Sequence, residues 1–222
     1  MTGQPAVRTV VRDGILEVVI DRPVLALPVL DALAAALDRA ELEAVPVILR
    51  SSHPSIFLAG AHLAEIATLD RHSARSYAHK GRSVIDRLTR LPAPVVAVVH
   101  GPCSGGGFDL VLASDEIVVG PGARFHHPGA VRGLVTGWGG TDRVPSRLGG
   151  SEARRALVLG RPIEAEQALR IGLVGMIADD PASAAHDRVR MLASIHPRRL
   201  EMWRTLRHGR FVDRFRAVVV HP

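Results

Sequence analysis

The sequence predicts an α/β protein with a mostly parallel sheet, followed by a helical C-terminal region. Short apolar runs, such as residues 47–49 and 94–99, alternate along the chain with segments of helical periodicity. The run at 94–99 is rich in β-branched residues and apolar almost throughout, which is typical of a strand buried on both faces. After residue 181 the pattern is helical only and rich in arginine.

The N-terminal part favours a hairpin, because strands over 7–11 and 15–20 are joined by Asp13-Gly14, a strong turn signal. A helix is expected over 28–44, where apolar residues recur at helical spacing. The remaining expected elements, in order, are a strand over 47–49, helices over 63–69 and 74–91, the strand over 94–99, a helix over 108–113, strands over 115–119 and 123–126, helices over 137–148, from 151 onward and over 162–169, a strand over 173–177, and helices near 184–195 and 198–206.

Composition bounds the compartment and the partners. The 222 residues are 47% hydrophobic, yet no apolar run reaches the roughly 20 residues that span a bilayer, so no membrane partner is expected. Residues 1–5 lack the features of a signal peptide, and a single cysteine excludes an internal disulfide, so we expect a cytoplasmic protein.

The net charge of +6 comes almost wholly from arginine, which suits an anionic small molecule or an acidic carrier protein. Nucleic acid is not expected, because the basic residues are mixed with acidic ones and no aromatic platform accompanies them.

The turn after the strand over 94–99 is the centre of the functional argument. Gly101 and Pro102 are followed by three consecutive glycines, Gly105 to Gly107, and then by an apolar helix. A strand that turns through glycines into a helix leaves free backbone N–H groups, which favour an oxygen that gains negative charge. The spacing of a dinucleotide-binding loop and the lysine of a phosphate-binding loop are both absent. The turn therefore favours a developing oxyanion on a small carbonyl substrate.

Four motifs carry a resemblance to a known family. They are residues 57–61 (Phe-Leu-Ala-Gly-Ala), 100–107 (His-Gly-Pro-Cys-Ser-Gly-Gly-Gly), 139–141 (Gly-Gly-Thr), and 160–163 with Ala168 and 172–174. In this order the sequence resembles the enoyl-CoA hydratase/isomerase (crotonase) superfamily over about residues 7–177. The resemblance implies a spiral of repeated ββα units over residues 1–178 and a helical region over 179–222 that serves as a cap or an oligomer contact. It also implies a homotrimer or hexamer.

The resemblance further implies that the backbone N–H groups of Ala61 and Gly106 form an oxyanion hole for an acyl thioester. A thioester enolate places negative charge on its carbonyl oxygen, so such donors lower the barrier to its formation. The residues expected to bind the substrate around these donors are Ala59, Gly60, Gly105, Gly107, Phe108, Gly129 and Trp138.

The sequence departs from the family where two glutamates would act as acid and base. One position holds Asp109, a shorter carboxylate, and the other holds Gly129, which has no side chain. Asp109 lies three residues after Gly106, on the first turn of the expected helix, where its side chain points back toward the helix start. We expect Asp109 to act as the general acid/base or to orient water, and ordinary two-glutamate hydration is disfavoured.

Histidines are the other candidates for proton transfer, because imidazole titrates near neutrality. His62 stands where the family often has an aspartate after the oxyanion alanine, and His126 and His127 approach from the neighbouring strand. We expect His62 and His127 to assist Asp109. No His or Cys spacing supports a metal, and Cys103 is expected to pack in the turn.

No cofactor is expected beyond the group that carries the acyl chain. The loop over 24–27 is shorter than the family's CoA-contacting loop, which leaves acyl carrier protein as an alternative to coenzyme A. An acidic carrier would meet the arginines between Arg188 and Arg216, which can equally form a solvated helix face.

The sequence thus favours an enzyme that forms the enolate of an acyl thioester and catalyses isomerisation, dehydration or decarboxylation. Two alternatives stay open. One is an acyl-thioester binding protein without chemistry. The other is a hydrolase of a carbon–carbon bond in a diketone, with histidine as the base.

Overall fold

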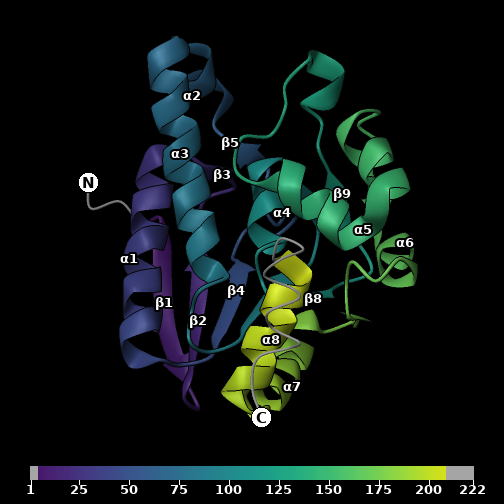
Figure 1. The fold of residues 1–222 in the computed structure, drawn as a ribbon. Helices are drawn as coiled ribbons and strands as arrows, with labels where there is room; N and C mark the ends of the chain where they lie inside the picture. Colours follow the sequence, from purple (N-terminus) through teal and green to yellow (C-terminus); the bar gives the residue numbers. More distant parts are fainter. Residues whose placement is uncertain (1–4, 209–222) are drawn as a thin grey trace.

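The computed structural model describes residues 5–208, which form a mixed α/β arrangement (Figure 1). Its strands are β1 (Val7–Arg12), β2 (Ile15–Ile20), β3 (Val24–Leu25), β4 (Val47–Ser51), β5 (Gly60–Ala61), β6 (Val95–Val99), β7 (Pro102–Ser104), β8 (Glu116–Val119), β9 (Arg124–His126), β10 (Ile163–Glu164) and β11 (Met176–Ile177). Its helices are α1 (Leu27–Glu43), α2 (Leu63–Ala67), α3 (Arg71–Leu88), α4 (Gly106–Val111), α5 (Gly140–Leu157), α6 (Ala165–Arg170), α7 (Pro181–Ala193) and α8 (Pro197–His208), with a 3₁₀ turn at Ala130–Arg132.

The main sheet has six strands in the order β1-β2-β4-β6-β8-β11. Strands β1 and β2 are antiparallel, joined through Asp13 and Gly14, which both have positive φ, and the other neighbours are parallel. The predicted hairpin and the mostly parallel sheet are therefore confirmed.

Alternating residues of the central strands point to opposite faces of the sheet, and each face packs in its own apolar layer. On one face, Val95, Ala97 and Val99 of β6 join the large core that includes α1, α3 and α4, and Figure 1 shows α1 and α3 side by side. On the other face, Val96 and Val98 pack against α7. Both faces of β6 are thus covered, as its unbroken apolar run predicts. Helix α7, which lies in the region expected to be helical after residue 178, thus packs directly on the sheet.

Two small sheets bring the residues of the site together, and the sequence did not predict these sheets. Strand β3 pairs in parallel with β5, and a second sheet has the order β10-β9-β7. The N–H of Ser104 donates to the Leu58 carbonyl oxygen at 2.8 Å, and Leu58 bridges Cys103. The segments around residues 58–61 and 102–106 therefore run side by side although more than 40 residues separate them.

Some predicted boundaries were wrong. The helix expected over 162–169 starts later, because Ile163 and Glu164 pair with β9 as β10. The strand expected over 173–177 is confined to β11, since the N–H groups of Leu173 and Val174 donate to the Ala168 carbonyl at the end of α6. The helices expected over 137–148 and from 151 form α5, which is kinked at Gly149.

Helix α8 is fixed to the core by a buried ion pair. Arg204 contacts both carboxylate oxygens of Asp115 at 2.5 and 2.7 Å, and it also donates to the carbonyl oxygens of Leu91 and Ala93. The side chains of Arg204 and Asp115 are only 11% and 3% exposed. Between residues 5 and 208, none of the helices combines the length and apolar character needed to traverse a lipid bilayer.

Candidate active site

A cavity of about 300 Å³ opens where the two glycine-containing segments meet. Ala59, Gly60 and Ala61 reach it from the start of α2, and Gly105 and Gly106 reach it from the start of α4. All five residues were predicted to belong to the site. Gly106 is the first residue of α4, so its N–H has no acceptor within the helix.

Glycine is required at residue 60 for two independent reasons. Its φ is +103°, which L side chains rarely adopt. A Cβ there would also lie 2.8 Å from the Ser104 carbonyl oxygen and 3.3 Å from the Gly106 nitrogen. The backbone of residue 60 therefore packs directly against the turn that carries the Gly106 N–H.

Asp109 of α4 is fully buried and lines the cavity. The Thr136 hydroxyl donates a hydrogen bond to its Oδ2. Its Oδ1 lies 3.3 Å from Nε2 of His127, close enough for a hydrogen bond but without the geometry of one, and both atoms are buried and otherwise unpartnered. A carboxylate, an imidazole and a hydroxyl thus meet at one point of the cavity wall, which is a set of groups able to hold and move a proton.

The surroundings leave Asp109 as the only carboxylate among the described residues that line this cavity. Gly129, where family hydratases have a second glutamate, also lines the wall, and a Cβ there would already lie 3.1 Å from Leu134. Gly140 abuts Asp109 so closely that an added Cβ would overlap Oδ1. The described wall of this cavity therefore carries one acid, not two.

Several other predicted residues lie away from the cavity walls. His62 caps α2, its Nδ1 accepting the Glu65 N–H at 3.2 Å, and His126 contacts the Gly160 carbonyl oxygen through Nε2 at 2.8 Å. Neither lines the cavity. Of the predicted histidines, His127 is the one that the fold brings to Asp109.

Gly107 and Phe108 are also outside the cavity walls. Gly107 packs against Leu58, and the Phe108 ring stacks 5.2 Å from Phe125 and 5.1 Å from His127. Cys103 is buried, and burial, followed by the charge of Asp109, raises the pKa of its thiol well above the usual value. The thiol is therefore a packing group, as expected.

Trp138 and Gly129 do line the cavity, as predicted. Trp138 is 3% exposed and is wedged between Gly81 of α3 and Gly106, where a Cβ on either glycine would overlap the indole ring. The remaining wall is mostly apolar and comes from α2, α3, the loop between them, the loop after β9 and the end of α5. Its apolar residues include Leu63, Ile66, Leu69, Ala74, Ala78, Leu134 and Leu157.

Sequence reasoning missed Thr136 and Tyr77, which also line the cavity. Thr136 is 27 residues from Asp109, and no spacing rule connects them. Tyr77 lies on the face of α3 that lines the cavity. It is the single tyrosine of the sequence, and this was the one feature that could have marked it as a candidate site residue.

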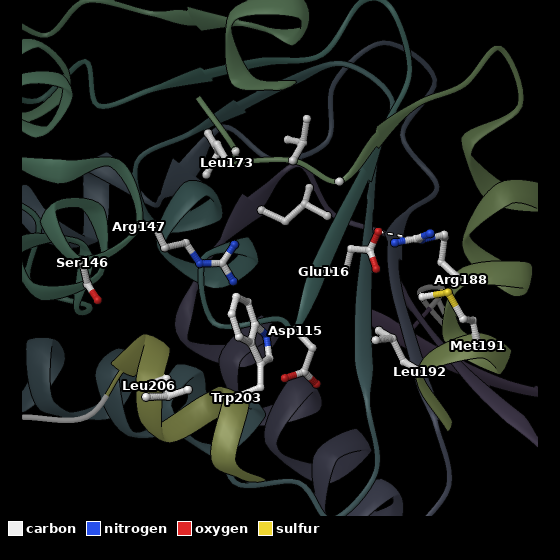
Figure 2. Close-up of a pocket in the computed structure, with 14 residues that line it drawn as sticks. Asp115, Glu116, Ser146, Arg147, Leu173, Arg188, Met191, Leu192, Trp203 and Leu206 are labelled. Atoms are coloured by element: carbon white, nitrogen blue, oxygen red, sulfur yellow. Dashed lines mark hydrogen bonds and ion pairs between the residues drawn. The ribbon is translucent and has the colours of Figure 1, made fainter. Parts of the chain in front are cut away.

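A second cavity, of about 500 Å³, lies between β8, α7 and α8 (Figure 2). Figure 2 shows Glu116 paired with Arg188, whose Nε lies 2.7 Å from Oε1. Asp115, the other carboxylate of this wall, is bound by Arg204. Because both acids are neutralised by arginine, this cavity does not offer a proton-transfer group.

Across the described part of the chain, no three His, Cys, Asp or Glu side chains are grouped so that they could hold a metal ion. The side chains with a hydroxyl or ionisable group that line the first cavity are Tyr77, Asp109, His127, Arg132 and Thr136.

Comparison with known proteins identifies the family and the fold. The family model described as "Enoyl-CoA hydratase/isomerase" matches residues 11–207. An enoyl-CoA hydratase from Bacillus anthracis is 26% identical, with a TM-score of 0.83 over 90% of this chain and 81% of that one. An enoyl-CoA hydratase from Thermoplasma volcanium is 25% identical, with a TM-score of 0.84 over 90% and 82%. DspI from Pseudomonas aeruginosa, at 24% identity and a TM-score of 0.84 over 92% and 81%, supports the fold alone.

These likenesses confirm the predicted crotonase-type fold with its helical C-terminal region. Since the family model spans most of the sequence, the chain belongs to the enoyl-CoA hydratase/isomerase family.

Proposed function

We propose that this protein is an enzyme that forms the enolate of an acyl thioester and moves a proton at its α-carbon. The observation that carries the proposal is one cavity lined by Ala61, Gly106, Asp109 and His127. Membership of an acyl-CoA-processing family supports the thioester as the substrate class. The N–H groups of Ala61 and Gly106 are the proposed oxyanion donors.

In the proposed reaction, the thioester carbonyl oxygen accepts hydrogen bonds from Ala61 and Gly106. The Asp109 carboxylate removes the α-proton, and the electrons of the broken C–H bond move onto the carbonyl oxygen. Thr136 donates to Oδ2 and so holds the carboxylate with Oδ1 toward His127. Returning the proton from Asp109 to another carbon gives isomerisation. Passing it instead to a β-hydroxyl, which the enolate electrons expel as water with formation of the carbon–carbon double bond, gives dehydration.

Two-glutamate hydration is not proposed, because Gly129 supplies no second acid. Decarboxylation also fits, since the departing carboxylate leaves the same enolate and needs only one proton donor afterward. We therefore propose a lyase or isomerase. These reactions share the enolate, so the first experiment tests for that intermediate.

The test is hydrogen exchange of the α-protons. The enzyme is incubated with saturated and unsaturated acyl-CoA thioesters in D₂O, and the masses of the thioesters are then measured by mass spectrometry. Deuterium at the α-carbon, dependent on Asp109, is the expected result. Tight binding without exchange would instead make the protein a non-catalytic thioester binder.

A second candidate is hydrolysis of a carbon–carbon bond in a diketone. It is favoured by the 3.3 Å approach of His127 to Asp109, since a carboxylate beside an imidazole can orient it as a base for water. Cleavage of a cyclic β-diketone to a keto acid, with no exchange on any thioester, would establish this alternative.

Coenzyme A is the carrier we propose. Of the arginines that an acidic carrier protein was expected to meet, Arg188, Arg190 and Arg204 already contact carboxylates of this chain. Arg210, Arg214 and Arg216 lie outside the described residues. Turnover of acyl-CoA equal to or faster than that of the same acyl group on a carrier protein is expected.

We also propose a homotrimer or hexamer. Met191 of α7 and Met202, Trp203 and Leu206 of α8 are each at least 37% exposed, and this much apolar surface on two adjacent helices suits a subunit contact. Light scattering of the purified protein measures the oligomeric state directly.

A further inference from the structure

Tyr77 carries the one polar side chain on the face of α3 that lines the catalytic cavity. Residues 74, 77 and 78 of α3 line the cavity, and residue 81, one turn further on, packs against Trp138. This spacing places all four on one side of the helix. The other three are alanine or glycine, so that face is otherwise small and apolar.

The Tyr77 hydroxyl is buried without a hydrogen-bond partner. The residue is 8% exposed, and its Oη makes no hydrogen bond in the described structure. The Glu65 carboxylate acts on it through its charge, and the backbone of His62 lies close by and lowers its pKa without meeting the geometry of a hydrogen bond. A buried hydroxyl left unpaired is costly, so a group that binds in the cavity and accepts from it gains affinity.

The Tyr77 ring is held at a fixed place relative to the proposed oxyanion donors. Its centroid is 5.5 Å from that of Trp138, which in turn packs against Gly106. Interiors packed in this way leave little freedom for a ring to shift. The hydroxyl therefore has a defined position relative to a thioester carbonyl bound at Gly106.

The phenol stays protonated throughout the physiological range. Burial is the main cause and the charge of Glu65 the second, and together they raise the pKa of Tyr77 to about 12. Glu65 keeps its position because both of its carboxylate oxygens accept from the Leu27 N–H, at 3.2 and 3.3 Å. Tyr77 thus carries a neutral hydroxyl, enclosed in the cavity wall, that donates one hydrogen bond and can accept another.

We infer that Tyr77 recognises an oxygen substituent on the acyl chain of the substrate, so that the substrate class is an oxygenated acyl thioester rather than a plain one. This inference rests on the proposed function, since it assumes that a thioester carbonyl is bound at Ala61 and Gly106. A plain hydrocarbon chain would leave the hydroxyl unpaired, whereas a hydroxyl, oxo or carboxylate oxygen pairs with it. Sites that hydrogen-bond a substrate oxygen discriminate strongly against the analogue that lacks it.

The test compares hexanoyl-CoA with its monohydroxylated analogues, substituted at carbons 3, 4, 5 or 6. Dissociation constants are measured by calorimetry for the full-length wild-type protein and for Tyr77→Phe, which keeps the ring against Trp138. We expect the wild type to bind at least one hydroxylated analogue tenfold more tightly than hexanoyl-CoA, equal to about 1.4 kcal/mol. Tyr77→Phe should reduce that preference to less than threefold.

A matched control is Ser83→Ala, which removes another hydroxyl of α3. Ser83 is exposed and donates to the Lys80 carbonyl, away from the cavity, so the preference should persist. A merely structural role of Tyr77 would weaken the binding of every thioester equally and leave the ratio intact, which would overturn the inference. A wild type without any preference would overturn it as well.

Exchange in D₂O separates this inference from the proposed function. If the wild type exchanges the α-protons of hexanoyl-CoA but shows no preference for oxygen, the function stands and the role of Tyr77 is wrong. If no thioester is bound, both are wrong.

Discussion

His127 Nε2 lies 3.3 Å from Asp109 Oδ1, and both side chains are buried against the same cavity. Among the described residues neither atom makes a hydrogen bond, while the second carboxylate oxygen accepts one from Thr136. The pair is therefore arranged so that one proton can be held between a carboxylate and an imidazole next to a bound substrate.

The first prediction concerns this pair. Asp109→Asn should slow α-proton exchange at least 100-fold, because general acid/base groups contribute about 10²- to 10⁴-fold and the amide cannot accept the proton. His127→Gln should slow it about tenfold. Both rates are measured by mass spectrometry with a short acyl-CoA in D₂O.

Asp142→Asn is the control for the pair, since its carboxylate is 62% exposed and pairs with Arg82 outside the cavity. Its exchange rate should match that of the wild type. Exchange by Asp109→Asn at the wild-type rate would contradict the assigned role.

The second prediction concerns the contact between the two backbone segments. Gly60→Ala should lower the exchange rate at least 100-fold, because the new Cβ must displace the Ser104 carbonyl and the Gly106 N–H. The rate is measured as before, with circular dichroism to show that the variant folds.

Gly14→Ala separates packing from backbone strain. Gly14 has φ +73° in the β1–β2 turn, but an added Cβ meets nothing within 4 Å. This variant should lose about 1 kcal/mol of stability and keep its activity. Equal activity losses in the two variants would mean that strain, not the contact with Gly106, explains the effect.

The third prediction concerns the attachment of α8. Arg204→Ala should lower the free energy of unfolding by about 3 kcal/mol, because it leaves the buried Asp115 carboxylate without its guanidinium. Urea denaturation measures the change, and the backbone amides of α8 should exchange their hydrogens faster than in the wild type. Arg190→Ala removes a pair whose side chains are 50% and 76% exposed, and it should cost less than about 0.5 kcal/mol.

The fourth prediction concerns pH and Glu17, whose side chain is 3% exposed. Burial pushes its pKa up, but the hydrogen bond from Arg50 and the charges of Arg50, Arg12 and His186 outweigh burial, and the pKa lies below the ordinary 4.5. A lowered carboxyl pKa stabilises the fold above pH 4.5, and this contribution is lost as the pH falls through the folded-state value.

Glu17→Gln should therefore destabilise the protein by about 2 kcal/mol at pH 7, less than for a fully buried pair because Arg50 is 29% exposed. The difference from the wild type should shrink steadily below pH 4.5. Glu166→Gln, at an 88% exposed carboxylate, is the control and should change stability at neither pH. A difference that grows on acidification would contradict the assignment.

The sequence by itself determined the main sheet, the β1–β2 hairpin and the glycine turn at residues 105–107. These features depend on local signals, namely the apolar strand runs, the Asp13-Gly14 turn and the three consecutive glycines. Such features can be predicted from the sequence because the residues that determine them are close together in the chain. The segment at residues 59–61 was expected from the resemblance to the family, and its contact with Gly106 is tertiary.

Only the tertiary structure decided which histidine reaches Asp109. The sequence favoured His62 and His127 as partners of Asp109 and also offered His126. In the structure His62 caps α2 and His126 contacts a carbonyl oxygen, whereas His127 lies beside Asp109. Thr136 joins the site through its hydrogen bond to Asp109 of α4, and Tyr77 joins it through its ring contact with Trp138, which packs against Gly106. Such contacts depend on side-chain shape across elements, for which no periodicity or spacing exists in the sequence.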